Sequence, residues 1–82
     1  MSEDEFTPKP SLRLGRYRHY KGNDYEVLDL VCHSETHEWL VLYKRLYERE
    51  GPELWVRPYE MFVEAVTING KTMPRFQYIG DV

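Results

Sequence analysis

The sequence has one cysteine, no long apolar run and no strong excess of one charge, and each absence excludes a class of protein. With Cys32 as the single cysteine in 82 residues, the chain cannot form an internal disulfide, and we expect a reducing compartment. No stretch of about 18 apolar residues is present, so we expect no transmembrane helix. The first ten residues, MSEDEFTPKP, lack the basic and apolar regions of a secretory signal. We therefore expect a cytoplasmic protein.

Charge is nearly balanced, which argues against a strongly basic nucleic-acid-binding protein. The chain has 14 acidic and 11 basic residues, and Glu3, Asp4 and Glu5 stand together near its start. Without these three acids, the rest of the chain carries as many acidic as basic residues. Residues 6–23 nevertheless hold five basic residues and no acidic one: Lys9, Arg13, Arg16, Arg18 and Lys21. This local basic stripe is either a solvated strand edge or part of a ligand surface.

One small domain is predicted over residues 15–80, after an N-terminal arm. Residues 1–14 contain prolines and charges without apolar periodicity, so we expect a disordered arm that is dispensable for folding. From Gly15 onward, tyrosine, tryptophan and β-branched residues recur between turn residues, as in a series of short strands. Strands are expected in RYRHY (16–20), DYEVLDLVCH (24–33), WLVLYKRLY (39–47), LWVR (54–57), VEAVTI (63–68) and RFQYI (75–79), with one helical turn in PYEMF (58–62).

This pattern predicts an all-β fold, a small SH3-like barrel of five or six short strands with one short helical turn. An OB-like barrel is the alternative. Either barrel would close the sheet and remove most exposed edges. The segment KGND (21–24) and the dipeptide Asn69–Gly70 are strong turn signals. Strict alternation would place Leu28 and Leu30 on one face of their strand and Val27 on the other. We expect a monomer.

The segment HSETHE (33–38) concentrates polar side chains beside Cys32. Its two histidines are spaced to meet on one face of a helix but not across a hairpin loop, and the spacing differs from the zinc motif HExxH. Ser34 and Thr36 favour a turn because their hydroxyls can bond nearby backbone. We therefore predict a polar turn, no stoichiometric metal, no cofactor and no catalytic residue. The alternative is a small metal-dependent hydrolase that uses His33, Glu35 and His37.

The basic and aromatic residues give the leading functional hypothesis. Rings and planar cations alternate in the first strand, which suits contacts to phosphates and bases, although such rings also pack as ordinary cross-strand pairs. Trp55 and Arg57 lie two residues apart on a predicted strand and so share a face. We predict a non-catalytic binding module for RNA, a nucleotide or a peptide; a protein-docking accessory domain is the alternative. The candidate ligand-binding residues are Arg16, Tyr17, Arg18, His19, Lys21, His33, Glu35, Trp55 and Arg57.

Five segments in a fixed order carry a family resemblance. They are GRYRHYKGNDYEVL, HSET, VLYKRLY, LWVRPYEMFVE and MPRFQYI, which run from about Gly15 to Ile79. Together they resemble a family of small bacterial domains known as domain of unknown function 1653. The family has no established activity or ligand, so the resemblance implies no catalytic residue. It implies a recurring pattern that omits Cys32 and His37 and includes His19, Lys21, His33, Ser34, Glu35, Thr36, Tyr43, Trp55, Arg57 and Pro58.

Overall fold

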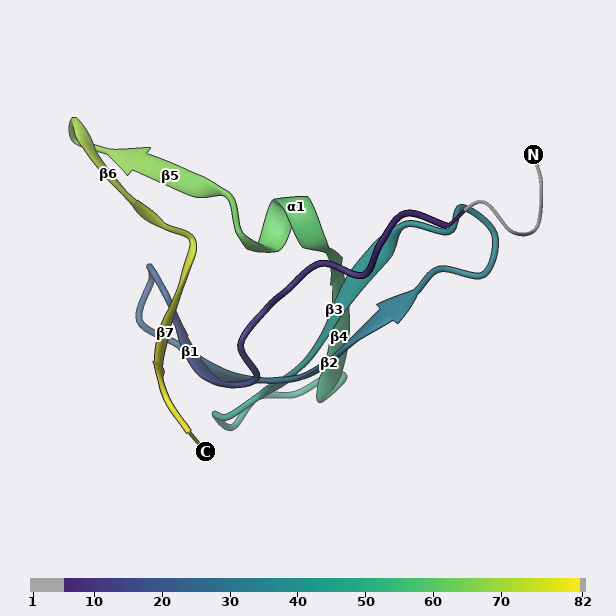
Figure 1. Cartoon of the computed structure of the whole chain (residues 1–82). Helices are drawn as coiled ribbons and strands as arrows, with labels where there is room; N and C mark the ends of the chain where they lie inside the picture. The colour runs from purple at the N-terminus through teal and green to yellow at the C-terminus, as the bar shows by residue number, and fades with distance from the viewer. Residues whose placement is uncertain (1–5, 82) are drawn as a thin grey trace.

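The computed structural model describes residues 6–81, in which seven strands and one short helix form two antiparallel sheets (Figure 1). The elements are β1 (Gly15–His19), β2 (Asp24–Cys32), β3 (Trp39–Arg45), β4 (Leu54–Pro58), α1 (Tyr59–Phe62), β5 (Ala65–Ile68), β6 (Lys71–Pro74) and β7 (Phe76–Gly80). The larger sheet has the order β4-β3-β2-β1-β7, and β5 and β6 form a separate hairpin.

The all-β prediction is confirmed, and the predicted barrel is corrected to an open sheet. Among residues 6–81, β4 and β7 each pair with one neighbour, so the five-stranded sheet does not close. The reason lies in the segment between these two strands. Asn69 and Gly70 adopt φ values of 51° and 78°, which suit a two-residue hairpin turn and pair β5 with β6. These strands therefore pair with each other and do not bridge β4 to β7.

The core lies on one face of the larger sheet, where α1 covers it. The rings of Phe62, from α1, and Phe76, from β7, stack with a centroid distance of 4.1 Å and an interplanar angle of 6°. On β3, alternation holds, since Val41 and Tyr43 are both buried. The buried apolar residues are Tyr17, Val27, Leu30, Val41, Tyr43, Phe62 and Phe76.

On β2, strict alternation fails. The pairing with β3 shifts register between Val27 and Asp29, which is the mark of a β-bulge. One extra residue at this point reverses the faces that follow, so Val27 and Leu30 are both buried. The prediction that Leu28 and Leu30 share a face opposite Val27 is therefore wrong.

Residues 6–14 run beside the domain without forming a helix or strand, and Figure 1 shows them following part of β3. The indole N–H of Trp39 donates to the Thr7 carbonyl at 3.0 Å, and the Tyr17 hydroxyl donates to the Arg13 carbonyl at 2.6 Å. Leu12 packs against the core. The remainder of the predicted disordered arm, residues 1–5, lies outside the described residues. From these contacts, we expect residues 6–14 to stabilise the domain.

No helix within residues 6–81 has the length and apolar character needed to cross a membrane.

Candidate functional site

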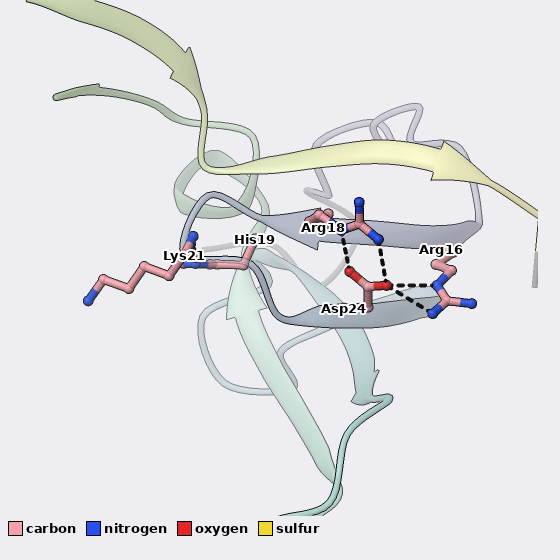
Figure 2. A network of polar contacts seen from close by, with 5 residues as sticks. All are labelled: Arg16, Arg18, His19, Lys21 and Asp24. Atoms are coloured by element: carbon pink, nitrogen blue, oxygen red, sulfur yellow. Dashed lines mark hydrogen bonds and ion pairs between the residues drawn. The ribbon is translucent and has the colours of Figure 1, made fainter.

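Two arginines on the exposed face of β1 share one carboxylate. Arg16 and Arg18 alternate with Tyr17, so they project opposite this buried tyrosine. The Arg16 Nη2 and Arg18 Nε atoms lie 2.9 Å and 2.8 Å from the Asp24 carboxylate oxygens, as Figure 2 shows. Hydrogen bonding from Arg18, and also from Arg16, lowers the pKa of the Asp24 carboxyl. The predicted basic stripe is thus partly neutralised within its own hairpin.

His19 lies on the other face of β1, where it joins the core. Its Nδ1 atom accepts a hydrogen bond from the Lys21 backbone N–H at 3.1 Å, so a neutral imidazole carries its proton on Nε2. Its ring meets the Phe76 ring edge to face, with a centroid distance of 4.9 Å. Burial lowers the pKa of His19, and the nearby charges of Arg57, Arg75 and Lys21 lower it further. His19 is therefore a neutral N–H donor at pH 7, in a positively charged neighbourhood.

Arg57 reaches the same face from β4. Trp55 and Arg57 oppose Tyr43 and Val41 across the β3–β4 ladder, and directly opposed residues point to the same side of a sheet. Both therefore stand on the core face. The Arg57 guanidinium carbon lies 5.5 Å from the Phe76 ring centroid, and its Nε atom lies 3.4 Å from the Tyr43 hydroxyl. We call the surface formed by His19, Trp55 and Arg57 over these two rings the Arg57 face.

Within residues 6–81, the guanidinium of Arg57 has no carboxylate partner, unlike that of Arg75. Among residues 6–81, no carboxylate oxygen lies within 4.0 Å of it, and its half-buried side chain makes one long hydrogen bond, to Tyr43, while lying over the Phe76 ring. Arg75, by contrast, pairs with Glu64 at 2.7 Å. Trp55, next to Arg57 on this face, is 43% exposed although it points to the core side. An aromatic ring and an unpaired planar cation are thus presented together to solvent.

The HSETHE segment forms a loop between β2 and β3. The backbone N–H of His33 donates to the Glu38 carbonyl at 2.9 Å, and that of His37 donates to the His33 carbonyl at 2.8 Å. The His33 Nδ1 atom accepts from the backbone N–H groups of Glu35 and Thr36 at 3.0 Å and 3.3 Å. His33 thus caps the turn in the way that an aspartate or asparagine side chain often does. The HSETHE segment therefore forms the predicted polar turn.

In the part of the chain that the structure describes, no set of side chains is arranged to bind a metal ion. No group of three or more His, Cys, Asp or Glu side chains within residues 6–81 is placed to hold an ion. The His33 Nδ1 atom is also occupied by the turn. That the purified protein contains no zinc stays a prediction.

The predicted site residues do not form one surface, because β2 separates them. His19 and Lys21 lie beyond its Asp24 end, whereas His33 and Glu35 lie beyond the other end. The nine residues of β2 span about 30 Å, at about 3.3 Å for each residue of a strand. The HSET turn and the first-strand cations are therefore at opposite ends of the molecule.

Burial and strand faces divide the remaining candidates. Tyr17 is 5% exposed and belongs to the core, so it has little surface to offer a ligand. Arg16 and Arg18 face away from it, on the exposed side of the strand. His19, Trp55 and Arg57 are brought together, with Lys21 in the adjacent turn.

Sequence reasoning missed the two rings beneath this face, Tyr43 and Phe76. Tyr43 comes from β3 and Phe76 from β7, and neither is close in the sequence to the other or to His19. Tyr43 belonged to the recurring pattern that the family resemblance implied, and that was the single signal for it. No spacing rule joins residues of three or four different strands, so Phe76 could be found from the packing alone.

Comparisons with known proteins match most of the chain. A family model described as "Protein of unknown function (DUF1653)" matches residues 15–78. A crystal structure of a protein belonging to DUF1653 from Bordetella bronchiseptica is similar to this chain, with a TM-score of 0.83 and 42% sequence identity. That match covers 87% of this chain and 91% of the other. No curated protein matches the chain.

Proposed function

Because this chain belongs to the DUF1653 family, whose description assigns no function, we propose a function from the chain's own side chains. We propose a non-catalytic binding module that recognises an anionic ligand carrying a flat ring, a nucleotide or a short single-stranded nucleic acid, at the Arg57 face. The observation that carries this proposal is the half-buried Arg57 guanidinium without a carboxylate partner among residues 6–81. A partly buried charge is costly unless it is paired, so the face gains stability when an anion binds.

The groups around Arg57 fit a phosphate and a base. A guanidinium offers a planar fork of N–H donors that matches two oxygens of a phosphate. The Nε2–H of His19 is a second donor nearby, and Lys21 adds charge in the adjacent turn. The exposed ring of Trp55 provides a surface on which a base can stack, which contributes about 1–3 kcal/mol in single-strand-binding proteins.

The charge of the chain favours a short ligand over a duplex. Affinity for duplex DNA comes largely from many phosphate contacts made by lysine and arginine. Here, Arg16 and Arg18 share Asp24, and Arg75 pairs with Glu64. The chain as a whole has 14 acidic and 11 basic residues, so a long phosphate backbone meets a net negative charge, whereas one or two phosphates suffice to satisfy Arg57. We place this module in the cytoplasm as a monomer, in keeping with its single cysteine.

The test is an NMR titration that follows the indole N–H of Trp55. Adenosine monophosphate and a mixed-sequence RNA hexamer are the probes, and adenosine is the matched ligand without a phosphate. We expect saturable shifts with both probes, weaker binding at higher salt, and little response to adenosine. Arg57→Gln should lower the affinity at least about tenfold, because hydrogen bonds to charged groups contribute about 1.5–3 kcal/mol.

Lys71→Gln is the control for removing a positive charge, because Lys71 lies on the separate β5–β6 hairpin. This variant should bind both probes as the unmodified protein does. Equal binding of adenosine and its monophosphate, or full affinity in Arg57→Gln, would contradict the proposal.

A protein-docking role is the second candidate, and one observation favours it. On the edge strand β4, three consecutive apolar residues are exposed: Leu54 by 54%, Trp55 by 43% and Val56 by 53%. An exposed apolar edge can accept an extended peptide as an added strand. Binding of a partner that survives high salt and is lost in a Leu54→Ser, Val56→Ser double variant would support this role instead.

A further inference from the structure

A pocket lies beside the HSETHE turn, at the Cys32 end of β2, and Pro58 at the end of β4 is one of its lining residues. Its volume is about 530 Å³, within the range of small-ligand sites. Three parts of the chain form its walls: the N-terminal segment through Thr7 and Pro8, the β2–β3 connection with the first residue of β3 through Glu38 and Trp39, and the end of β4 with the beginning of α1. We call it the Trp39 pocket.

The charge of this pocket is negative. Glu38 and Glu60 line it, and no lysine or arginine does. Lys9, in the adjacent N-terminal segment, is paired with Asp29 at 3.6 Å. Among residues 6–81, neither glutamate forms an ion pair, and the one hydrogen bond to the Glu38 carboxylate comes from the Thr36 hydroxyl at 3.4 Å. Two carboxylates are therefore available to a positively charged ligand.

Two aromatic residues line the same pocket, and the N-terminal segment fixes both of them. The Trp39 indole N–H donates to the Thr7 carbonyl at 3.0 Å, and the Tyr59 hydroxyl lies 3.5 Å from the Ser11 carbonyl. Because these polar atoms are bonded to backbone, the rings contribute mainly aromatic surface to the pocket. Ring faces attract organic cations, and tryptophan does so most strongly.

His37, also in the pocket wall, is held in an unusual state. Its backbone has a φ of 61°, which is uncommon for a residue other than glycine, and its buried Nδ1 atom has no hydrogen-bond partner among residues 6–81. Its ring stacks on Phe6 at a centroid distance of 4.3 Å. Strained backbone and unpartnered polar atoms gather at ligand sites, where their cost is tolerated.

We infer that the Trp39 pocket binds an organic cation, an alkylammonium group held between the aromatic rings of Trp39 and Tyr59 and the carboxylates of Glu38 and Glu60. A lysine side chain has this chemistry, either in an extended peptide or as a small free amine. The pocket is larger than one ammonium group, so it also has room for the methylene chain. This inference is independent of the proposed anion-binding function, since it rests on other side chains and on a ligand of the opposite charge.

The two tryptophans of the chain provide one reporter for each site. We would titrate the ¹⁵N-labelled protein with Nα-acetyl-lysine amide, and with the uncharged Nα-acetyl-norleucine amide as the matched probe. The lysine compound should shift the Trp39 indole N–H saturably and leave that of Trp55 in place. The norleucine compound and an equal concentration of sodium chloride should move neither. A Trp39 signal that does not respond to the lysine compound would overturn the inference.

Charge removal gives a second test that does not endanger folding, because both glutamates are exposed. The Glu38→Gln, Glu60→Gln double variant should bind the lysine compound at least about tenfold more weakly. Glu48→Gln, Glu53→Gln is the matched control, since these acids lie in the exposed β3–β4 connection. Unchanged affinity in the first double variant, or an equal loss in the second, would contradict the inference.

Comparison of two amines identifies the source of the ligand. A glycine-flanked pentapeptide with a central lysine would be titrated beside n-butylammonium chloride. Tighter binding of the peptide by tenfold or more assigns the pocket to a protein segment, and equal binding assigns it to a small amine. Both results support an ammonium site, whereas binding of neither contradicts it.

Discussion

The two turns at the ends of β2 are built alike and differ in the charges that surround them. In one, the His19 Nδ1 atom accepts from the Lys21 backbone N–H at 3.1 Å; in the other, the His33 Nδ1 atom accepts from the Glu35 backbone N–H at 3.0 Å. Each histidine thus bonds the backbone two residues further on. Arg57 and other cations surround the first turn, whereas Glu38 and Glu60 line the pocket beside the second. We refer to them as the cationic end and the acidic end.

This difference teaches that a histidine in a polar loop is not by itself a sign of catalysis or metal binding. Both imidazoles are used first to cap a turn, which is a local structural role. Under the functions proposed above, the ligand of each end is decided by side chains from other elements, namely by Trp55 and Arg57 from β4 at the cationic end. At the acidic end, it is decided by the start of α1 and the N-terminal segment.

The largest effect should follow from removing the ring that supports the cationic end. Phe76 is 6% exposed and contacts His19, Phe62 and Arg57. Phe76→Ala should cost about 3–5 kcal/mol, which equals the whole net stability expected of so small a core, so we expect a largely unfolded protein by circular dichroism.

A pair of milder variants separates the two ends. Phe76→Leu should remain folded and weaken binding of adenosine monophosphate while leaving the Trp39 pocket intact. Phe6→Ala, at the acidic end, removes a ring that is 52% exposed and should cost under about 1 kcal/mol in urea unfolding. If Phe6→Ala destabilised the protein more than Phe76→Ala does, the main hydrophobic core would lie at the acidic end, which would contradict the packing described above.

Deleting residues 1–13 should have an intermediate effect, with its largest structural change at the acidic end. The deletion removes the acceptors of the Trp39 indole, the Tyr17 hydroxyl and the Tyr59 hydroxyl. The Tyr17 hydroxyl is partly buried, and a buried donor left without a partner costs about 1–3 kcal/mol, so the melting temperature should fall by several degrees. An unchanged melting temperature would instead support the expectation from sequence that the arm is dispensable.

The NMR signals of the two tryptophan indole N–H groups show which end of the molecule the deletion changes. Trp39 should shift because its partner, Thr7, is gone, and the cation pocket should lose one wall. Trp55 should keep its chemical shift and its response to adenosine monophosphate. Deletion of residues 1–5 alone, which lie outside the described residues, is the matched control and should leave the Trp39 signal in place. Equal movement of both indole signals on deleting residues 1–13 would show that the two ends are not separate.

Local features of the fold could be predicted from the sequence, whereas it could not be predicted whether the sheet closes into a barrel. The Asn69–Gly70 turn, the alternation around Tyr43 and the shared face of Trp55 and Arg57 all follow from spacing within one segment. The bulge between Val27 and Asp29 left no such trace, because it depends on how two strands fit together. The open sheet could not be predicted for the same reason. The sequence does not say whether β5 and β6 pair with each other or bridge β4 to β7, because packing decides between these pairings.

The candidate site divides in the same way. His19, Trp55 and Arg57 were found from residue type and strand spacing, although the same reasoning also included Arg16 and Arg18, which Asp24 occupies. The Trp39 pocket could not be foreseen, because one of its walls belongs to residues that the sequence indicated to be a disordered arm. Composition describes how a segment behaves alone, and it does not report the surface against which the segment packs.

The smallest effect, and the most direct comparison of the two ends, is the pH dependence of stability that His19 provides. Burial, with Arg57 and other cations nearby, lowers its pKa in the folded state, so the unfolded chain takes up this proton first as the pH falls. Stability from the neutral imidazole is therefore fully present above the ordinary histidine pKa of about 6.5 and declines as the pH falls from there towards the lowered value. His19→Asn keeps a side-chain acceptor for the Lys21 N–H and removes the titration, so its melting temperature should fall less between pH 7 and pH 5. His33→Asn is the matched variant at the acidic end, where Glu38 and Glu60 line the neighbouring pocket. An equal flattening of the pH dependence in both variants would mean that the surroundings of His19 do not set it apart.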